Sequence, residues 1–247
     1  MRYSGSKRRF MKELSPIIME YINNRGKNTL FVDAFCGGAN VISCIPHPYK
    51  IGVELNQYVC ALWNHIKENG MDGIPMSISK EEYYRVKEDY VNNTGQYPLW
   101  YIGYVGSCCS YGGAWWGGYA NYNPNKNEDH IGEAYRGLCK QVKDFKHLDT
   151  TEFINASYDG VKLNNNNIII YCDPPYANTK GYKDKFDSDK FWQWARNTSG
   201  NGITVLVSEY QAPNDFKCIW SAIKSDGMAQ TDGKRQERKV EKLFTIP

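Results

Sequence analysis

The stretch "TLFVDAFCGGAN", residues 29–40, predicts a short buried strand that runs into a glycine loop. Its apolar residues surround one carboxylate, Asp33, and Gly37 and Gly38 follow closely. Ligands of open α/β sheets bind beyond the carboxyl ends of the strands, where glycines let the backbone approach them. The full G-x-G-x-x-G pattern is absent, so a plain tight turn is the better explanation of these glycines when they are taken alone.

A second predicted strand ends in another carboxylate. The run "YKIGVELN", residues 49–56, is largely apolar up to Glu54, which lies 17 positions after Gly37. That spacing suits an acid that binds a ribose diol. The same alternation continues, with helices expected at residues 57–69, 79–91, 131–148 and 189–197 and buried strands at residues 166–172 and 202–210. The pattern predicts a Rossmann-like parallel α/β sheet with helices on both faces, and Ser79 as the N-cap of the second helix.

Residues 95–122 have a different composition. Their 28 positions hold nine Trp or Tyr residues and seven Gly, so we expect an insert here and not a strand of the sheet. These aromatic side chains could wedge between stacked bases or pack on one another, and the sequence favours neither reading. From Phe216 onward, "SDG" and "TDG" turn signals predict antiparallel strands that close the edge of the sheet.

Composition narrows the class of protein. The chain has 247 residues, with Lys+Arg 30 against Asp+Glu 27, so its net charge of +3 does not announce a nucleic-acid partner. Basic residues nevertheless gather in residues 2–12 and 234–242. These runs are either solvent-exposed faces or the border of a binding groove, and the sequence does not decide between the two. The eight cysteines show no C-x-x-C spacing and predict free thiols without a metal. With no long apolar run or leader-like start, we expect a soluble protein of the cytoplasm or another intracellular setting.

The sharpest chemical signal is "YCDPPYAN", residues 171–178, which directly follows a buried strand. An exocyclic amine on a purine is a poor nucleophile because its lone pair is delocalised into the ring. The Asp173 carboxylate and the Pro174 carbonyl could accept its two N–H bonds and favour a pyramidal nitrogen. Pro174 and Pro175 would hold the chain end in one conformation. Tyr176 offers a plate for stacking a base, which contributes about 1–3 kcal/mol.

Taken in order, these segments resemble the Dam-like family of DNA adenine-N6 methyltransferases over nearly the whole chain. The family's cofactor motif precedes its target-recognition region, and its catalytic motif follows. The segments that carry the resemblance are "YSGSK" at residues 3–7, "FVDAFCGGAN" at 31–40, "VELN" at 53–56, "ASY" at 156–158, "YCDPPY" at 171–176 and "VLVSEY" at 205–210. Two positions depart mildly: Ala39 stands where a second glycine is common, and Glu54 where Asp is frequent.

The resemblance implies a class I methyltransferase sheet that uses S-adenosylmethionine (SAM) as methyl donor and releases S-adenosylhomocysteine. No metal is implied. The residues it assigns to the cofactor are Tyr3, Lys7, Asp33, Phe35, Gly37, Glu54, Ser157 and Asp173. The residues it assigns to catalysis and the target base are Asp173, Pro174, Pro175 and Tyr176. The acceptor would be an adenine flipped out of double-stranded DNA, and a monomer is the simplest form that binds one site.

The resemblance also implies a division of the chain. Residues 1–70 and 151–247 would form the catalytic core, and residues 71–150 an inserted target-recognition region. Candidate DNA contacts, given by their residue types and positions, are Tyr111, Trp115, Lys140, Lys143, Tyr182 and Lys183. Cys36 and Cys172 are expected to be packing thiols, because direct attack by N6 needs no covalent cysteine adduct.

Other functions remain open at this point. The same motif could serve another planar amine, such as cytosine N4, an RNA base or a protein glutamine. A SAM-binding regulator without turnover is a further alternative, against which the intact "DPPY" at residues 173–176 argues. A zinc deaminase also acts on exocyclic amines, but its H-x-E and P-C-x-x-C patterns are absent from the sequence.

Overall fold

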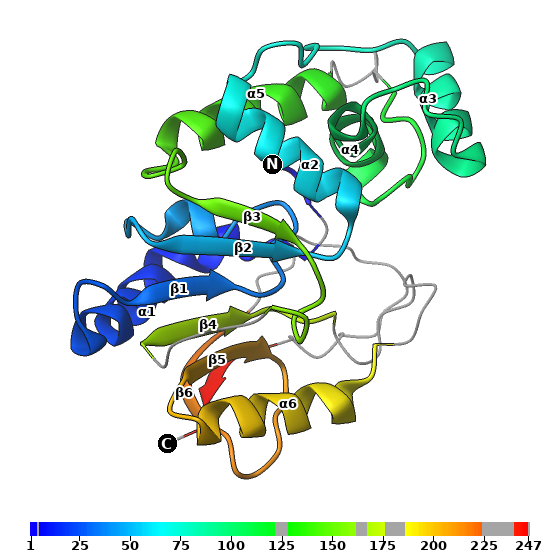
Figure 1. The fold of residues 1–247 in the computed structure, drawn as a ribbon. Helices are drawn as coiled ribbons and strands as arrows, with labels where there is room; N and C mark the ends of the chain where they lie inside the picture. Colours follow the sequence, from blue (N-terminus) through cyan, green and yellow to red (C-terminus); the bar gives the residue numbers. More distant parts are fainter. Residues whose placement is uncertain (4, 122–127, 162–166, 176–185, 224–239, 247) are drawn as a thin grey trace. The chain divides into compact units, whose positions relative to one another are not determined.

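The computed structural model describes residues 1–247 apart from 4, 122–127, 162–166, 176–185, 224–239 and 247. The chain forms two compact units, Met1–Val161 and Lys162–Pro247 (Figure 1), and each is described by itself.

The strands of the first unit are parallel. They are β1 (Leu30–Asp33), β2 (Lys50–Glu54) and β3 (Glu152–Asn155). Val32 pairs with Ile51, and Val53 pairs with Ile154, so β2 lies between the other two. Because the strands run in the same direction, their carboxyl ends meet at one edge, where Asp33 and Glu54 are the last residues of β1 and β2.

The helices of the first unit are η1 (Arg8–Phe10), α1 (Met11–Arg25), η2 (Ile42–Cys44), α2 (Gln57–Asn69), α3 (Lys80–Asn92), α4 (Leu99–Cys108), η3 (Tyr111–Gly113) and α5 (His130–Asp144). Of these, α2 packs against β2 and β3, and α4 packs on α2 (Figure 1). Helices α2 and α3 begin at capping side chains. Asn56 Oδ1 accepts from the backbone N–H of Tyr58 at 3.0 Å, and Ser79 Oγ accepts from that of Glu82 at 3.1 Å. The predicted helix at residues 57–69 and the Ser79 cap are confirmed.

Helix α4 lies inside the aromatic insert and was not predicted as a helix. Its residues are buried from Ile102 to Cys108, so the sequence lacks the polar face that marks an amphipathic helix. It packs on α2 at Gly103, where an added Cβ would lie only 2.1 Å from the carbonyl oxygen of Tyr58. The glycine therefore sets how closely the two helices approach.

A buried lysine ties the start of β2 to the neighbouring η2 region and to a segment distant in sequence. Lys50 is 2 % exposed, and its Nζ donates to the carbonyl oxygens of Ile42 at 3.3 Å, Ile45 at 3.0 Å and Lys146 at 2.9 Å. The ammonium also lies 4.5 Å from the centre of the Phe145 ring, within the range of a cation–π contact. Lys50 thus fastens η2 and the end of α5 to the sheet.

Burial lowers the pKa of the Lys50 ammonium from 10.5 to about 8. Between these values the unfolded chain keeps a proton that the folded chain has released, so the lysine's contribution to stability increases as pH rises from about 8 to 10.5.

We therefore expect the free energy of unfolding of the wild type, relative to Lys50→Met, to increase over this interval. Urea unfolding at each pH measures it. Lys27→Met, at an exposed position, serves as the control, and a difference between wild type and Lys50→Met that does not change with pH contradicts the prediction.

The second unit contains one parallel and two antiparallel strand pairings. Its elements are β4 (Ile168–Cys172), α6 (Ser188–Gly200), β5 (Thr204–Glu209), β6 (Lys217–Ile223) and β7 (Val240–Thr245). β4 pairs with β5 in parallel, and β7 pairs antiparallel with both β5 and β6. The predicted antiparallel strands after Phe216 are confirmed, and the turn signals between β6 and β7 lie outside the described residues. Every residue of β4 is buried, as a fully covered strand requires.

Parallel strands alternating with helices define the α/β class, and the Rossmann-like fold predicted from the sequence is confirmed. Within the described part of the chain, no helix combines the length and the apolar character needed to cross a membrane.

Candidate functional site

The glycine loop after β1 is built around Tyr3. An added Cβ at Gly37 would lie 2.7 Å from a carbon of the Tyr3 ring, and one at Gly38 would lie 2.7 Å from the Tyr3 Cβ. Gly37 also has a φ of 47°, in the left-handed region. Glycine is the residue that satisfies both requirements at Gly37, so Tyr3 and the loop lie in direct contact. Their assignment to the cofactor stays a prediction.

Glu54 faces the same loop. Its Oε2 accepts from the backbone N–H of Gly37 at 2.7 Å, and its Oε1 accepts from that of Asn56 at 2.7 Å. Each carboxylate oxygen has a further lone pair, so the group can still accept from a ligand. The side chain of Asn155 donates to the carbonyl oxygens of Glu54 and Leu55, both at 2.9 Å, and holds the ends of β2 and β3 together.

Burial governs the acid–base behaviour at this edge. It raises the pKa of the Glu54 carboxyl, although the bonds from Asn56 and Gly37 act in the opposite direction. Burial also raises the pKa of the Cys36 thiol, and the negative charges of Asp33 and Glu54 raise it further. Because Cys36 is held as a thiol, it is a poor nucleophile, consistent with the packing role expected from the sequence.

Further contacts fix the ends of the loop. Asp33 Oδ2 accepts from the backbone N–H of Ile42 at 3.3 Å, at the start of η2. The indole Nε1 of Trp63, on α2, donates to the carbonyl oxygen of Gly37 at 3.1 Å. Trp63 is fully buried, and sequence analysis did not single it out because its spacing is that of an ordinary core residue.

Phe35 brings the "ASY" segment to the loop. Its ring stacks on that of Tyr158, with centroids 5.3 Å apart and planes inclined by 22°. Tyr158 was not among the predicted site residues. The predicted residue beside it, Ser157, donates its hydroxyl to Asp159 Oδ1 at 2.5 Å. Lys7 is 2 % exposed and donates to the carbonyl oxygen of Gly5 at 3.5 Å.

The predicted catalytic segment begins where β4 ends. Asp173 and Pro175 are half-buried, and Pro174 is buried, directly after Cys172. A rigid dipeptide at the carboxyl end of a covered strand holds the carboxylate at a defined position in the second unit. Tyr176, Tyr182 and Lys183 lie outside the described residues.

The aromatic insert packs on α2 and α3. The ring of Trp115 stacks on Tyr58 at 6.0 Å and meets Tyr90 edge-on at 5.6 Å. Its Nε1 donates to the Tyr90 hydroxyl at 3.4 Å. Tyr111 is different, because it is 65 % exposed. The structure therefore shows an aromatic cluster at Trp115 and a solvent-facing ring at Tyr111.

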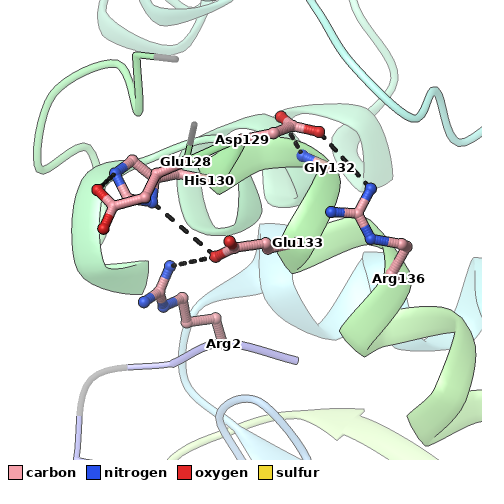
Figure 2. A network of polar contacts seen from close by, with 7 residues as sticks. All are labelled: Arg2, Glu128, Asp129, His130, Gly132, Glu133 and Arg136. Atoms are coloured by element: carbon pink, nitrogen blue, oxygen red, sulfur yellow. Dashed lines mark hydrogen bonds and ion pairs between the residues drawn. The ribbon is translucent and has the colours of Figure 1, made fainter. Parts of the chain in front are cut away.

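Polar contacts tie the N-terminal segment to the start of α5. Figure 2 shows the network of Arg2, Glu128, Asp129, His130, Gly132, Glu133 and Arg136. Asp129 Oδ1 caps α5 by accepting from the Gly132 N–H at 2.9 Å, and Asp129 also lies 3.6 Å from Arg136. Arg2 lies 3.9 Å from Glu133 on the same helix. Because these groups are well exposed, the pairs orient the segment more than they stabilise it.

The two segments enclose a hollow of about 350 Å³ whose lining includes Arg2, Arg8, Lys140 and Glu133. Arg2, Arg8 and Lys140 line this hollow together with a single carboxylate, that of Glu133. Part of the basic N-terminal run therefore borders a hollow in the surface. Lys140 lies 3.4 Å from Asp144 and is 76 % exposed, which leaves its ammonium accessible to water. Lys143 is also exposed on α5.

Parallel strands that end in carboxylates, followed by a glycine loop, are typical of Rossmann-like α/β enzymes. The model of the D12 class N6 adenine-specific DNA methyltransferases matches residues 3–221, so the chain belongs to that family.

Two individual proteins show weaker likeness. The type II methyltransferase M.FokI of Planomicrobium okeanokoites is 22 % identical over 207 residues, which cover 78 % of this chain and 31 % of that protein. The chain thus spans about a third of that relative. A solved structure of HI0767 from Haemophilus influenzae, a protein assigned as a methylase, matches with a TM-score of 0.33 and 11 % identity over 96 % of each chain.

Proposed function

We propose that this protein transfers the methyl group of SAM to the exocyclic N6 of an adenine in DNA. The observation that carries the proposal is the Asp173-Pro174-Pro175 segment at the carboxyl end of buried strand β4. Membership of the D12 class supports the same reaction. In this proposal residues 1–70 and 151–247 form the catalytic core, residues 71–150 recognise the target, and a monomer acts on double-stranded DNA inside the cell.

The residues at the edge of β1 and β2 fit the cofactor. The Glu54 carboxylate can accept from a ribose diol, and Gly37 and Gly38 let the loop backbone lie directly against Tyr3, where a Cβ would clash. Phe35 and Tyr158 offer stacked rings for an adenine. Tyr3 lies against Gly37 and Gly38, and the proposal also assigns Lys7 to the cofactor. When bound, SAM supplies a methyl group on a sulfonium, which is electrophilic enough to need no metal.

Loss of the Glu54 charge is expected to weaken SAM binding. In Glu54→Gln an amide N–H₂ would face a backbone N–H, and one charged acceptor for the ribose would be lost. We expect the Kd for SAM to rise by about 10- to 100-fold, equivalent to about 1.5–3 kcal/mol. Calorimetric titration measures it. Glu54→Asp retains the charge and is expected to bind more tightly than Glu54→Gln. Glu68→Gln, on the exposed face of α2, is the control. Unchanged affinity in Glu54→Gln contradicts the assignment.

At the acceptor side, the Asp173 carboxylate and the Pro174 carbonyl accept the two N–H bonds of the adenine amine. This arrangement directs the nitrogen lone pair away from the ring and toward the methyl group. Since Pro174 and Pro175 have no N–H, neither competes for these acceptors. A base within the duplex cannot reach such a site, so the adenine is extruded, and Tyr176 stacks on it.

Lys140 and Lys143, the exposed lysines of α5, are proposed to contact DNA phosphates. Further proposed DNA contacts are Tyr111, Trp115, Tyr182 and Lys183. Trp115 would act through the packed insert, because its ring lies against Tyr58 and Tyr90.

Lys143→Ala is expected to lower the salt dependence of DNA binding. Each phosphate contact contributes about 0.9 to the slope of log K against log salt, so the slope should fall by about 1. Adding Lys140→Ala should lower it by a similar amount again. Fluorescence anisotropy with a labelled duplex at several salt concentrations measures the slope. Lys27→Ala, an exposed lysine before β1, is the matched control, and equal slopes for Lys143→Ala and Lys27→Ala contradict the contact.

The proposed function is tested by expressing the protein in a methylation-free host and mapping modified bases in its genome. N6-methyladenine in one short sequence, absent from cells carrying an empty vector, supports the proposal and gives the recognition site. Unmodified adenine, with purified and folded protein that binds SAM, contradicts it. Digestion of cellular RNA and protein from the same cells then tests an RNA base or a glutamine as the acceptor.

A further inference from the structure

Gln141 connects helix α5 to the glycine loop across about a hundred residues of sequence. Its side chain is 1 % exposed. The amide Nε2 lies 3.0 Å from the carbonyl oxygen of Gly38, 3.0 Å from that of Ala39 and 3.2 Å from Ser43 Oγ. A long-range contact of this kind has no signal in the sequence.

The chemistry of the contact fixes the orientation of the amide. Two carbonyl oxygens can only accept, so the group that faces them must be the Gln141 N–H₂ and not its oxygen. Its two hydrogens serve Gly38 and Ala39, and the Ser43 hydroxyl oxygen lies within reach as a third, shared acceptor. Gln141 therefore acts here as a donor.

Three consecutive carbonyl groups of the loop accept from side chains. Trp63 of α2 donates to Gly37, and Gln141 of α5 donates to both Gly38 and Ala39. Ala39 has a φ of 51°, a left-handed conformation that a residue other than glycine adopts only under local constraint. The bond to its carbonyl helps to hold it there.

We propose that Gln141 is a positioning residue that holds the glycine loop in the conformation that binds SAM. This inference rests on the proposed function, because it takes the loop to be the cofactor loop. Because Gln141 is buried and donates to the loop, we expect it to touch neither the sulfonium nor the base. Its loss should therefore weaken SAM binding and leave the methyl-transfer step intact once SAM is bound. A loop that is already ordered binds more tightly because less freedom is lost on binding.

Gln141→Met tests the inference, since Met has a similar shape and no N–H donor. We expect its Kd and KM for SAM to rise about tenfold, while kcat at saturating SAM and KM for DNA stay within about twofold. In Gln141→Glu, a carboxylate would face the carbonyl oxygens of Gly38 and Ala39, and the rise should be larger. Val142→Ala, a half-buried neighbour on α5, is the control and should leave the Kd for SAM unchanged.

The outcomes separate this inference from the function on which it rests. SAM binding by the wild type with the same Kd for Gln141→Met overturns the inference alone. A loss in kcat of Gln141→Met as large as the rise in its Kd for SAM also overturns the inference, because a residue that only positions the loop affects SAM binding and not the transfer step. A wild type that binds no SAM contradicts both. If Gln141→Met loses its cooperative unfolding transition, Gln141 serves the stability of the first unit and the inference fails.

Discussion

Asp173→Ala is expected to lower the rate of methyl transfer by about 10³-fold, equivalent to about 4 kcal/mol of transition-state stabilisation. In the proposed mechanism the carboxylate is the charged acceptor for the adenine amine, and its loss leaves the uncharged Pro174 carbonyl as the other acceptor. Asp173→Asn keeps one carbonyl acceptor in the same shape and should retain more activity than Asp173→Ala. Single-turnover incorporation of a labelled methyl group, with SAM and DNA both saturating, measures the transfer rate directly.

The control is Asp189→Asn, an exposed acid in the first turn of α6, which should transfer methyl groups at the wild-type rate. Thermal unfolding and DNA binding should be retained in all three variants. An Asp173→Ala protein whose rate stays within tenfold of the wild type would remove Asp173 from the catalytic step and would require another acceptor for the amine.

Gly103→Ala is expected to destabilise the first unit by about 3 kcal/mol, at the upper end of overpacking costs. The added methyl would lie 2.1 Å from the carbonyl oxygen of Tyr58 and 3.3 Å from the Cβ of Leu62. The nearest of these atoms belongs to the backbone of α2, so α4 must move for the methyl to fit. Urea unfolding followed by tryptophan fluorescence measures the change.

Gly137→Ala is the matched control because the same substitution is made in helix α5, where an added Cβ meets no atom within 4 Å. Alanine is the better helix former, so this variant should gain roughly 0.5–1 kcal/mol. If Gly103→Ala lowers the free energy of unfolding and Gly137→Ala raises it, the loss of stability at Gly103 results from the close approach of α4 and α2. A Gly103→Ala protein as stable as the wild type would show that the helices can separate freely.

Much of the fold was predictable because its signals are local. The apolar runs before Asp33 and Glu54 form β1 and β2, and Ser79 caps its helix through a bond to a residue three positions later. The spacing of Gly37 and Glu54 suggested that both lie at one ligand site, and a 2.7 Å hydrogen bond does join them. Their cofactor role stays a prediction.

The rest depends on contacts between residues distant in sequence. Helix α4 is buried on all sides from Ile102 to Cys108, so it has no polar face by which its period could be recognised. In the sequence, Lys50 has the position of an ordinary lysine at the start of a strand, and Gln141 that of a surface residue on an amphipathic helix. Both are buried because carbonyl groups from other segments accept their N–H bonds. Trp115 was a candidate DNA contact, and its placement in an aromatic cluster depends on Tyr58 and Tyr90.

The anchoring of α5 limits how specificity can be exchanged between relatives. A chimaera that replaces residues 71–150 as one cassette would also remove Gln141 and the Lys146 carbonyl that Lys50 binds. The recipient would then gain the proposed recognition surface of the donor but lose supports of its own glycine loop. Junctions placed after α4 and before Asp129 would leave those supports in the host, and they would confine the graft to the segment that carries Tyr111 and Trp115.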